Sequence, residues 1–402
     1  MSKFVPATRV SRIKSSASVA AAARVRELKA EGRRILDLTV GEPDFDTPDH
    51  IKAAAVEAIS KGETKYTSVT GTPELQKALL QAMELRTGLH YTPAELTIGG
   101  GAKQVIFTAF MASIDAGDEV IVPAPFWVSY PDMVLANDGT PVVVPCGEDV
   151  GFKLTPDALA GALTDRTKWV ILNTPSNPTG AVYSPVELRA LADVLAGYPH
   201  VYVLTDEIYD QIYFGGGRLP SLVEVAPGLK DRVLVVNGVS KAYAMTGWRL
   251  GYAAGPAPLI AAINKLQSQI SSCPSSVSQA ASAAALTGDQ GFVRDSVEIY
   301  RSRRDAAVAG LNAVDGLSCA TPEGAFYAYV NCAGAIGKTT PEGATIHDDQ
   351  DFVLYLLDHA SVAAIPGSAY GLGPYFRISY ATSLDIIEES IAAIDKAVQA
   401  LS

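Results

Sequence analysis

Short apolar runs alternate with longer stretches of helical periodicity along the middle of the chain. The runs are rich in β-branched residues and predict buried strands, at residues 96–101, 119–122, 141–145, 169–172, 201–204 and 233–236. The stretches between them predict helices, at residues 103–114, 130–137, 155–163 and 184–195. Repeated strand–helix units of this kind predict an α/β domain, with a mostly parallel sheet and helices on both of its faces.

The pattern changes on either side of this region. Before it, the sequence predicts an arm at residues 1–34 with one helix at 19–29 capped by Ser18, then a strand at 35–40 and helices at 49–61 and 73–87. After it, a second apolar run begins at Leu250, a helical region spans 257–312, and a mixed tail follows, with strands at 325–330, 362–365 and 375–380 and helices at 350–359 and from Asp385. We therefore expect residues 1–48 to form an N-terminal arm and part of a small domain, residues 49–290 a large domain, and residues 291–402 a C-terminal small α+β domain.

Composition and charge narrow the classes of function. The chain has 402 residues, of which 48% are hydrophobic and 19% charged, as in ordinary soluble globular proteins. Its formal net charge is −11 and no basic block stands out, which argues against nucleic acid as a partner. No apolar run approaches the length that spans a membrane, and the alanine-rich stretch near the N-terminus is too short for a signal peptide.

The four cysteines bear on the cellular compartment of the protein. Cys146, Cys273, Cys319 and Cys332 lie far apart, with no CxxC or Cys/His cluster. This spacing argues against a disulfide framework and against a zinc or other metal site. We expect reduced thiols and a cytoplasmic protein.

The segment 233–252 carries the strongest chemical signal. A buried strand ends at an Asn-Gly turn signal at 237–238, and Ser240 and Lys241 follow directly. Burial lowers the pKa of a lysine, and a neutral amine can attack a carbonyl to form a Schiff base. Arg249 follows eight residues later and stays charged in any surroundings, which suits a phosphate group. For an arbitrary pair of this kind, a solvated lysine and a salt-bridged arginine are the commoner outcome.

Small and polar residues also gather at other predicted strand ends, where ligands of open α/β sheets bind. Residues 99–104 end a strand and open a helix, so that backbone N–H groups can approach a phosphate. The other positions are 125–127, 173–180 and 206–209. Taken alone, each of these segments could simply be a tight turn, part of the core or a helix cap. Their coincidence at strand ends is stronger evidence for a binding site than any one of them.

The string Ser-Lys-Ala-Tyr-Ala-Met-Thr-Gly-Trp-Arg-Leu-Gly at residues 240–251 closely resembles the cofactor-lysine signature of class I (fold type I) aminotransferases, which use pyridoxal 5′-phosphate (PLP). The resemblance runs over nearly the whole chain. It implies a large domain with a mostly parallel seven-stranded sheet flanked by helices, and a smaller α+β domain. It also implies that Lys241 binds PLP as a Schiff base and that Arg249 binds the phosphate of PLP.

The same resemblance implies cofactor roles for other strand ends. Trp127 would stack on the pyridine ring of PLP, and Asn177 and Tyr209 would lie at its 3′-oxygen. Asp206 would supply the anion beside the pyridine nitrogen, so that the protonated ring can act as an electron sink. The remaining residues expected to bind the cofactor are Gly101, Ala102 and Lys103 of the phosphate loop, Ser240 beside the lysine, and Tyr66, which would reach the phosphate in the neighbouring subunit.

Substrate contacts are implied in the same way. The segment Pro-Tyr-Phe-Arg-Ile-Ser-Tyr at 374–380 resembles the family segment whose arginine, here Arg377, clamps the substrate α-carboxylate in a planar bidentate pair. Gly41 would approach the substrate by its backbone, and Trp127 and Asn177 would contact it. Without the resemblance, Arg377 would be read as part of a salt bridge at a strand edge.

Stretches at 41–48, 126–131 and 242–249 together look like the bacterial subgroup of aspartate aminotransferases, some of which also convert prephenate to arogenate. In that subgroup a lysine that matches Lys103 helps to bind the distal carboxylate, and a lysine that matches Lys14 is linked to prephenate use. The chain departs from the usual subgroup pattern at three positions: Ser15 replaces Pro, Ser18 replaces Thr and Ala102 replaces Gly.

We therefore expect a PLP-dependent enzyme that transfers the amino group of L-aspartate to 2-oxoglutarate by a ping-pong mechanism, and that also converts prephenate to L-arogenate. Its active sites would lie at a homodimer interface, because Tyr66 and Lys103 resemble residues that family members lend across it.

Other functions stay open. Another aminotransferase specificity or a Cβ/Cγ lyase of the same fold is the closest alternative. A regulator that binds DNA would carry an extra basic region of about 50–80 residues, for which the sequence shows no candidate. A nicotinamide dehydrogenase is disfavoured, because no glycine fingerprint opens a strand–helix–strand unit.

Overall fold

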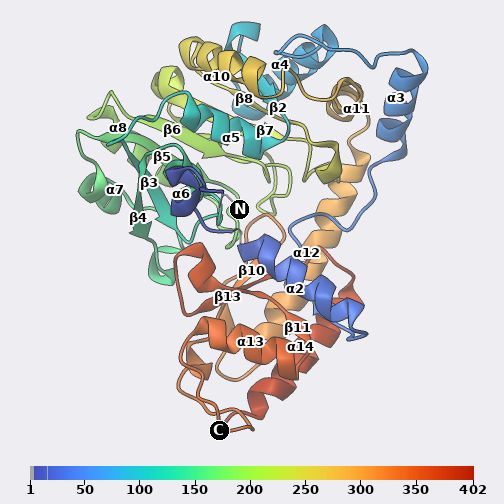
Figure 1. Ribbon diagram of the computed structural model, residues 1–402, viewed down its shortest axis with the longest axis vertical. Coiled ribbons are helices and arrows are strands. Elements are labelled where there is room, and N and C mark those ends of the chain that lie inside the picture. The colour runs from blue at the N-terminus through green and yellow to red at the C-terminus, as the bar shows by residue number, and fades with distance from the viewer. Residues whose placement is uncertain (1–3, 16) are drawn as a thin grey trace.

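The computed structural model describes residues 4–15 and 17–402, and the side chains of all of these except Ala17 and Ser18. Figure 1 shows an upper part built around a large sheet and a lower part that contains the C-terminus. A functional site between the two parts would contain residues from both. The fold decides which strand ends of each part lie at this site.

The upper part is built on a sheet of seven strands in the order β2-β8-β7-β6-β5-β3-β4. Only β8 is antiparallel to its neighbours, and the other pairs are parallel. The strands are β2 (Leu96–Gly99), β3 (Glu119–Ala124), β4 (Thr140–Pro145), β5 (Thr167–Asn173), β6 (Tyr202–Asp206), β7 (Val233–Gly238) and β8 (Gly251–Ala254). The predicted mostly parallel seven-stranded sheet is confirmed, and β8 lies in the apolar run that begins at Leu250.

Alternate residues of the central strands face opposite layers of helices. In β7, Val233 and Val235 belong to one apolar cluster, whereas Leu234 and Val236 belong to another. Because both faces are buried, these strands read in the sequence as continuous apolar runs. The first cluster includes residues of α3 (Asp49–Ser60), α4 (Pro73–Thr87), α7 (Pro156–Ala162), α8 (Pro185–Ala196), α9 (Leu222–Val225) and α11 (Ser276–Thr287). The second includes α5 (Ala102–Met111), α6 (Tyr130–Ala136) and α10 (Ala257–Ile270).

The lower part contains an antiparallel sheet in the order β12-β13-β10-β9 and a parallel pair, β1-β11. Its strands are β1 (Leu36–Asp37), β9 (Ser318–Cys319), β10 (Tyr327–Asn331), β11 (Val362–Ala363), β12 (Ile365–Pro366) and β13 (Tyr375–Ser379). Its helices include α12 (Gly291–Asn312), which descends from the upper part in Figure 1, α13 (Asp349–His359) and α14 (Leu384–Gln399).

One apolar core joins the N-terminal segment to the C-terminal region. Leu36 and Leu38 belong to the same buried cluster as residues of α12, α13 and α14. Closer to the N-terminus lie α1 (Thr8–Arg12), which contacts α6, and α2 (Ala17–Ala30). We propose to keep the predicted domain boundaries at residues 48/49 and 290/291, because this shared core places the segment before residue 48 with the small domain.

Several predicted element bounds were wrong. The strand predicted at 325–330 begins at Tyr327, because Ala325 has a φ of 59° and this left-handed conformation interrupts an extended strand. The strand predicted at 362–365 is two short strands, β11 and β12, in different sheets. The strand predicted at 35–40 is reduced to β1. The short elements α1, α9 and β9 are among those that were not predicted.

Two helix predictions also need correction. The helical region 257–312 is three helices, because the chain turns at 271–275, which includes Pro274, and again at 288–290. The first long helix begins at Ala17, before its predicted cap Ser18, whose side chain lies outside the described residues.

Candidate active site

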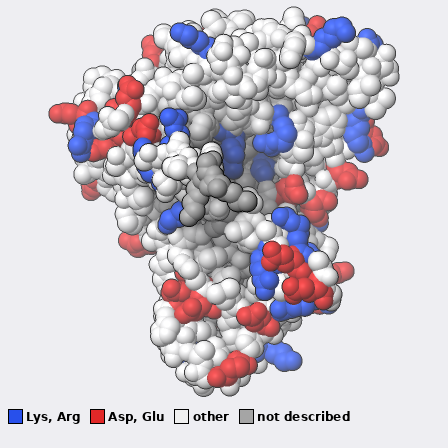
Figure 2. Space-filling view, in the orientation of Figure 1, with Lys and Arg blue, Asp and Glu red and all other residues white. Residues whose placement is uncertain are grey.

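A cavity of about 330 Å³ opens where the large sheet meets the small domain. Its lining comes from the carboxyl ends of β5 and β6, the loop after β7, the starts of α5 and α6, and strands β10 and β13. Figure 2 shows this hollow between the upper and lower parts of the molecule, with Lys and Arg side chains in it. Ligands of open α/β sheets bind at this place, so the cavity is the candidate site.

Lys241 lies just past β7 and is half-buried in the cavity. Its Nζ donates a hydrogen bond of 2.5 Å to the carbonyl oxygen of Gly41. Burial, together with the charges of Arg377 and Arg249, lowers the pKa of Lys241 to about 8, against the opposing effect of the Glu42 carboxylate. Near pH 8 a large fraction of this amine is therefore neutral, which is the form that attacks a carbonyl.

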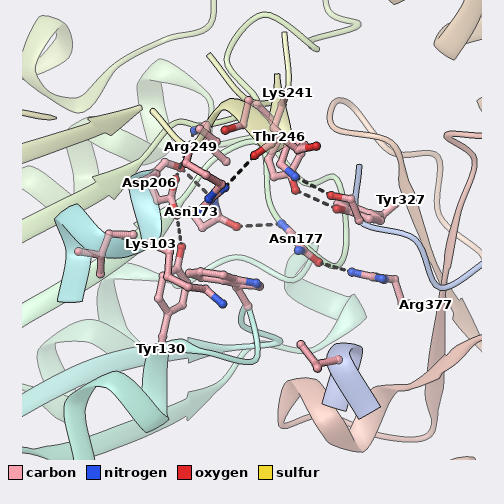
Figure 3. A pocket seen from close by; sticks show the side chains of 18 residues that line it. Lys103, Tyr130, Asn173, Asn177, Asp206, Lys241, Thr246, Arg249, Tyr327 and Arg377 are labelled. Atoms are coloured by element: carbon pink, nitrogen blue, oxygen red, sulfur yellow. Dashed lines mark hydrogen bonds between the residues drawn. The ribbon is translucent and has the colours of Figure 1, made fainter. Parts of the chain in front are cut away.

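Asp206 ends β6 and is buried in the cavity wall. The Tyr130 hydroxyl donates to its Oδ2 at 2.6 Å (Figure 3). The Ile208 N–H donates to its Oδ1 at 3.3 Å. Burial raises the pKa of Asp206 to about 6 despite these donors. Asn173 ties two strand ends together, because its Nδ2 donates to the backbone oxygen of Asp206 at 2.9 Å and its Oδ1 accepts from the Asn177 N–H at 2.8 Å. A buried carboxylate fixed in this way suits a protonated ring nitrogen.

The turn between β2 and α5 faces Arg249. Gly101 caps α5 with a φ of 99°, and a Cβ there would lie 2.5 Å from Nη2 of Arg249, so glycine is required for the guanidinium to approach. Arg249 donates from Nη1 to the Thr246 carbonyl at 2.9 Å and from Nη2 to the Gly100 carbonyl at 3.1 Å. The first N–H groups of α5, beginning at Ala102, have no acceptor within the helix. A guanidinium beside a helix N-terminus forms a cradle for an anion.

Arg377 lies on β13 and only 2% of its surface is exposed. Its Nη1 donates to Oδ1 of Asn177 at 3.1 Å, and its Nη2 donates to the Thr39 carbonyl at 2.6 Å. Its Cζ lies 4.3 Å from the ring centroid of Tyr327 and 5.4 Å from that of Tyr370. Within the described part of the chain, its Nε has no hydrogen-bond partner. A buried guanidinium with a spare N–H, held in one plane, suits a carboxylate ligand.

Two phenols close the cavity beside Lys241. The hydroxyls of Tyr209 and Tyr327 are hydrogen-bonded at 2.9 Å, and Nζ of Lys241 lies 5.9 Å from the Tyr209 ring centroid. Burial raises the pKa of both phenols, so both stay protonated at neutral pH. A Cβ at Gly41 would lie 3.3 Å from the Tyr327 hydroxyl, so the absence of a side chain at Gly41 leaves room for this pair.

The cavity collects most of the predicted site residues, although their individual roles stay predictions. Gly101 caps the helix at the edge of the cavity. The predicted residues that line it are Gly41, Ala102, Lys103, Trp127, Asn177, Asp206, Tyr209, Ser240, Lys241, Arg249 and Arg377.

Lys103 belongs to the cavity of its own chain. Its Nζ lies 4.8 Å from the ring centroid of Trp127, and burial, together with the charge of Arg249, lowers its pKa. Its contribution to this cavity therefore needs no second subunit, contrary to the expectation that Lys103 is lent across an interface.

Two predicted residues lie elsewhere. Tyr66 is 89% exposed and does not line the cavity. Lys14 is exposed and does not line it either, and its backbone N–H donates to Oδ1 of Asp132 on α6 at 3.1 Å. Among the described residues of the arm at 1–34, Val19 on α2 lines the cavity.

Sequence patterns missed two tyrosines of the site, Tyr130 and Tyr327. Tyr130 follows Trp127 by three residues and opens the helix predicted at 130–137, and this position does not distinguish it from a core aromatic. Tyr327 is one of several aromatic residues in an apolar strand, and nothing in the sequence separates it from core residues.

The chain matches the family described as aminotransferase class I and II over residues 33–394. It belongs to this family. It is 52% identical to a relative named aspartate aminotransferase from Rhizobium meliloti (strain 1021), over 99% of this chain and 97% of the relative. It is 51% identical to a relative named aspartate/prephenate aminotransferase from Cereibacter sphaeroides, over 96% of each chain.

Solved aminotransferase structures share the fold. The crystal structure of the aspartate aminotransferase from Rhizobium meliloti has a TM-score of 0.97 at 52% identity, with 100% of each chain covered. The aspartate aminotransferase from Thermus thermophilus with maleate has a TM-score of 0.90 at 38% identity, with 98% of this chain and 100% of that chain covered. The predicted fold type I architecture is confirmed.

Class I aminotransferases are enzymes that use PLP, and the chemistry of this cavity fits that cofactor. The amine complements the aldehyde of PLP, the buried carboxylate complements its ring nitrogen, and the anion cradle complements its phosphate. In the part of the chain that the structure describes, no group of three or more His, Cys, Asp or Glu residues could hold a metal ion. No helix among the described residues is long and apolar enough to cross a bilayer.

Proposed function

We propose that this aminotransferase converts L-aspartate and 2-oxoglutarate to oxaloacetate and L-glutamate, and that it also converts prephenate to L-arogenate. The presence of Lys241, Asp206 and Arg377 in one cavity carries the proposal, since these groups supply an amine, a ring-nitrogen partner and a carboxylate clamp. The names of the relatives that are 51% and 52% identical support the choice of substrates.

When bound, PLP would supply an aldehyde for the substrate amine and a protonated ring that withdraws electrons from the reacting carbon. Asp206 would hold the proton of the ring nitrogen, and Trp127 would cover one face of the ring. The other residues proposed to hold the cofactor are Gly101, Ala102, Lys103, Asn177, Tyr209, Ser240 and Arg249, with Tyr66 of a second subunit.

Lys241 has two tasks in this proposal. Its side chain would hold the aldehyde of the cofactor, and its amine, when free, would move the α-proton as base and then as acid. Its pKa of about 8 suits both directions of transfer near neutral pH. Arg377 fixes the α-carboxylate, and the Asn177 side chain holds the guanidinium in place, which directs the α-proton towards Lys241.

Basic groups on two sides of the cavity favour a dicarboxylate. Lys103 and Arg377 both line the cavity and lie on opposite sides of it in Figure 3. We propose that a substrate with two carboxylates pairs with both groups, whereas alanine has a carboxylate for only one of them. The Thermus thermophilus relative was solved with maleate, which is itself a four-carbon dicarboxylate.

The prephenate branch rests on the N-terminal arm. Lys14 lies between α1 and α2 with its side chain exposed, five residues before Val19 of the cavity lining. We propose that Lys14 serves the larger acceptor prephenate and not aspartate.

A homodimer with shared active sites is also part of the proposal. Val56 and Ile59 on α3 are 62% and 56% exposed, and Tyr66 follows them at 89%. A second copy would cover these apolar groups, and it would place Tyr66 at the partner's cavity.

Mixed dimers test whether Tyr66 acts across the interface. K241A and Y66A chains are each impaired, and their heterodimer holds one cavity with an intact Lys241 and an intact Tyr66 from the other chain. Recovery of activity on co-expression supports the shared site. If Tyr66 served its own chain, no cavity of the heterodimer would be complete and activity would stay low.

The cytoplasm is the proposed location. All four cysteines are free thiols in the structure, and Cys146, Cys319 and Cys332 are buried. Unpaired thiols are typical of a reducing compartment.

Product analysis tests the reaction. The purified enzyme, loaded with PLP, is incubated with L-aspartate and either 2-oxoglutarate or prephenate, and oxaloacetate, glutamate, arogenate and ammonia are quantified. The proposal predicts one glutamate or arogenate for each oxaloacetate, and no turnover without an oxo acid. Release of ammonia without an oxo acid would instead favour the Cβ/Cγ lyase.

A further inference from the structure

Tyr130 is a buried phenol whose hydroxyl is hydrogen-bonded to Asp206. Only 1% of its surface is exposed, and its hydroxyl donates to Oδ2 of Asp206 at 2.6 Å (Figure 3). Burial and the neighbouring carboxylate raise its pKa well above the ordinary value, so the hydroxyl keeps its proton. In this pair Tyr130 is therefore the donor and Asp206 the acceptor.

The position of Tyr130 is set by the turn that also carries Trp127. Its backbone N–H donates to the Trp127 carbonyl at 3.0 Å, and the two rings meet edge to face with centroids 5.2 Å apart. One turn of chain thus supplies both an aromatic ring in the cavity and the phenol that reaches Asp206. The phenol has little freedom to leave the carboxylate without disturbing Trp127.

Asp206 depends on this donor. Its carboxylate lies in surroundings that favour the neutral acid, since burial raises its pKa to about 6. The other donor to the carboxylate, the Ile208 N–H, is longer at 3.3 Å, and Lys241 is the cation whose charge favours ionisation. A neutral Asp206 would accept the N–H of a positively charged ring only weakly and would not balance its charge, so the hydroxyl bond matters for more than orientation.

We propose that Tyr130 is a positioning residue of the aminotransferase, whose hydroxyl keeps Asp206 anionic and turned to accept the N–H of the cofactor's pyridine ring. The inference rests on the proposed place of Asp206 beside that ring nitrogen. Tyr130 acts through Asp206 and does not itself touch the reacting atoms.

The test compares two cofactors in one variant. The apoenzyme and its Y130F variant are titrated with PLP and with the PLP analogue that carries C–H in place of the ring nitrogen, and tryptophan fluorescence gives the dissociation constants. Y130F should weaken PLP binding about tenfold, since a hydrogen bond to a charged group is lost. Binding of the analogue should change by less than about twofold, because it has no ring nitrogen for Asp206 to serve. The analogue therefore also reports whether the variant is folded.

Two further variants separate the possible failures. D206N should weaken the binding of PLP, relative to that of the analogue, at least as much as Y130F does. Y355F is the matched control, because it loses a buried phenol that donates to the Ala397 carbonyl at 2.8 Å in the small domain, and it should bind both cofactors normally. The role of Tyr130 is overturned if D206N weakens the binding of PLP more than that of the analogue but Y130F does not. Y130F would then weaken the binding of both cofactors equally or leave both unchanged. If D206N also affects the binding of PLP and of the analogue equally, Asp206 does not lie at the ring nitrogen, and the inference about Tyr130 is wrong as well.

Discussion

The strands around the cavity and the N-terminal arm both approach the site, but they hold their side chains in different ways. On the strands, Asp206 and Arg377 are buried, and each is bonded to a neighbour that comes from a different element. On the arm, Lys14 is exposed, and Arg12 forms an ion pair with Asp138 in which both side chains are about two-fifths exposed. Exposed pairs of this kind contribute little to stability.

This difference separates two kinds of function. Groups that must act at fixed distances on a proton or a carboxylate lie on the strands, where packing and hydrogen bonds leave one arrangement. Groups that adapt to the size of the substrate can lie on an arm, where a substitution costs the fold little. We therefore expect strand variants to lose the reaction and arm variants to change only the choice of substrate.

Removing the amine should have the largest effect. K241A should lower kcat for aspartate by about 10⁴-fold or more, because both the attack on the cofactor and the proton transfer are lost. Steady-state kinetics of the purified variant measure the loss, and its thermal unfolding shows whether the fold is kept. Retention of a tenth of the activity would mean that another group moves the proton.

Changing the shape of the carboxylate clamp should have the next largest effect. R377K keeps the charge but loses the planar fork and the bond to Asn177, so kcat/KM for aspartate should fall about 100-fold. R34K, at an exposed arginine paired with Glu389, is the matched control and should behave as the wild type. Equal kinetics for R377K and the wild type would place the α-carboxylate elsewhere.

The pKa of Lys241 predicts a pH dependence with a definite sign. Burial sets the pKa near 8, below the value of about 10.4 for an unfolded chain. The rate at which the apoenzyme takes up PLP should therefore rise about tenfold per pH unit below pH 8 and level off above it. Between the two pKa values the unfolded chain binds more protons, so the same burial makes stability rise with pH across that window. An uptake rate that still rises steeply at pH 9.5 would contradict the assigned pKa.

An arm variant should have the smallest and most selective effect. K14A should lower kcat/KM for prephenate by about tenfold, from the loss of one charge-assisted contact, and leave that for aspartate within about twofold. R12A, two residues earlier on the same exposed arm, is the control for a general disturbance. Equal losses for prephenate and aspartate would give Lys14 a structural role and contradict the contrast between arm and strands.

The sequence predicted those parts of the site that lie at strand ends. Lys241, Asp206 and Asn177 follow apolar runs, and both the alternating pattern and the resemblance to aminotransferases placed them in one cavity. The bounds of β10 and β11 were less predictable, because Ala325 takes a left-handed conformation and the short strands belong to two sheets. These are properties of tertiary pairing rather than of the local pattern.

Residues that act through another residue were the least predictable. Tyr130 and Tyr327 look like core aromatics in the sequence, and only their hydrogen bonds to Asp206 and Tyr209 reveal what they do. Tyr66 and Lys14 were predicted from the resemblance alone. Within one chain both lie away from the cavity lining, so their roles depend on a second subunit or on the arm.

The half-reaction tests the central claim most directly, namely that one cavity combines the amine, the carboxylate clamp and a second basic group. The enzyme loaded with PLP is mixed with aspartate, glutamate, arogenate or alanine, and the absorption band of the lysine-bound cofactor is followed by stopped flow. The account predicts loss of the band with the three acidic donors, at a rate at least about 100-fold higher for aspartate than for alanine. An unchanged band with every donor, or alanine reacting as fast as aspartate, would contradict it.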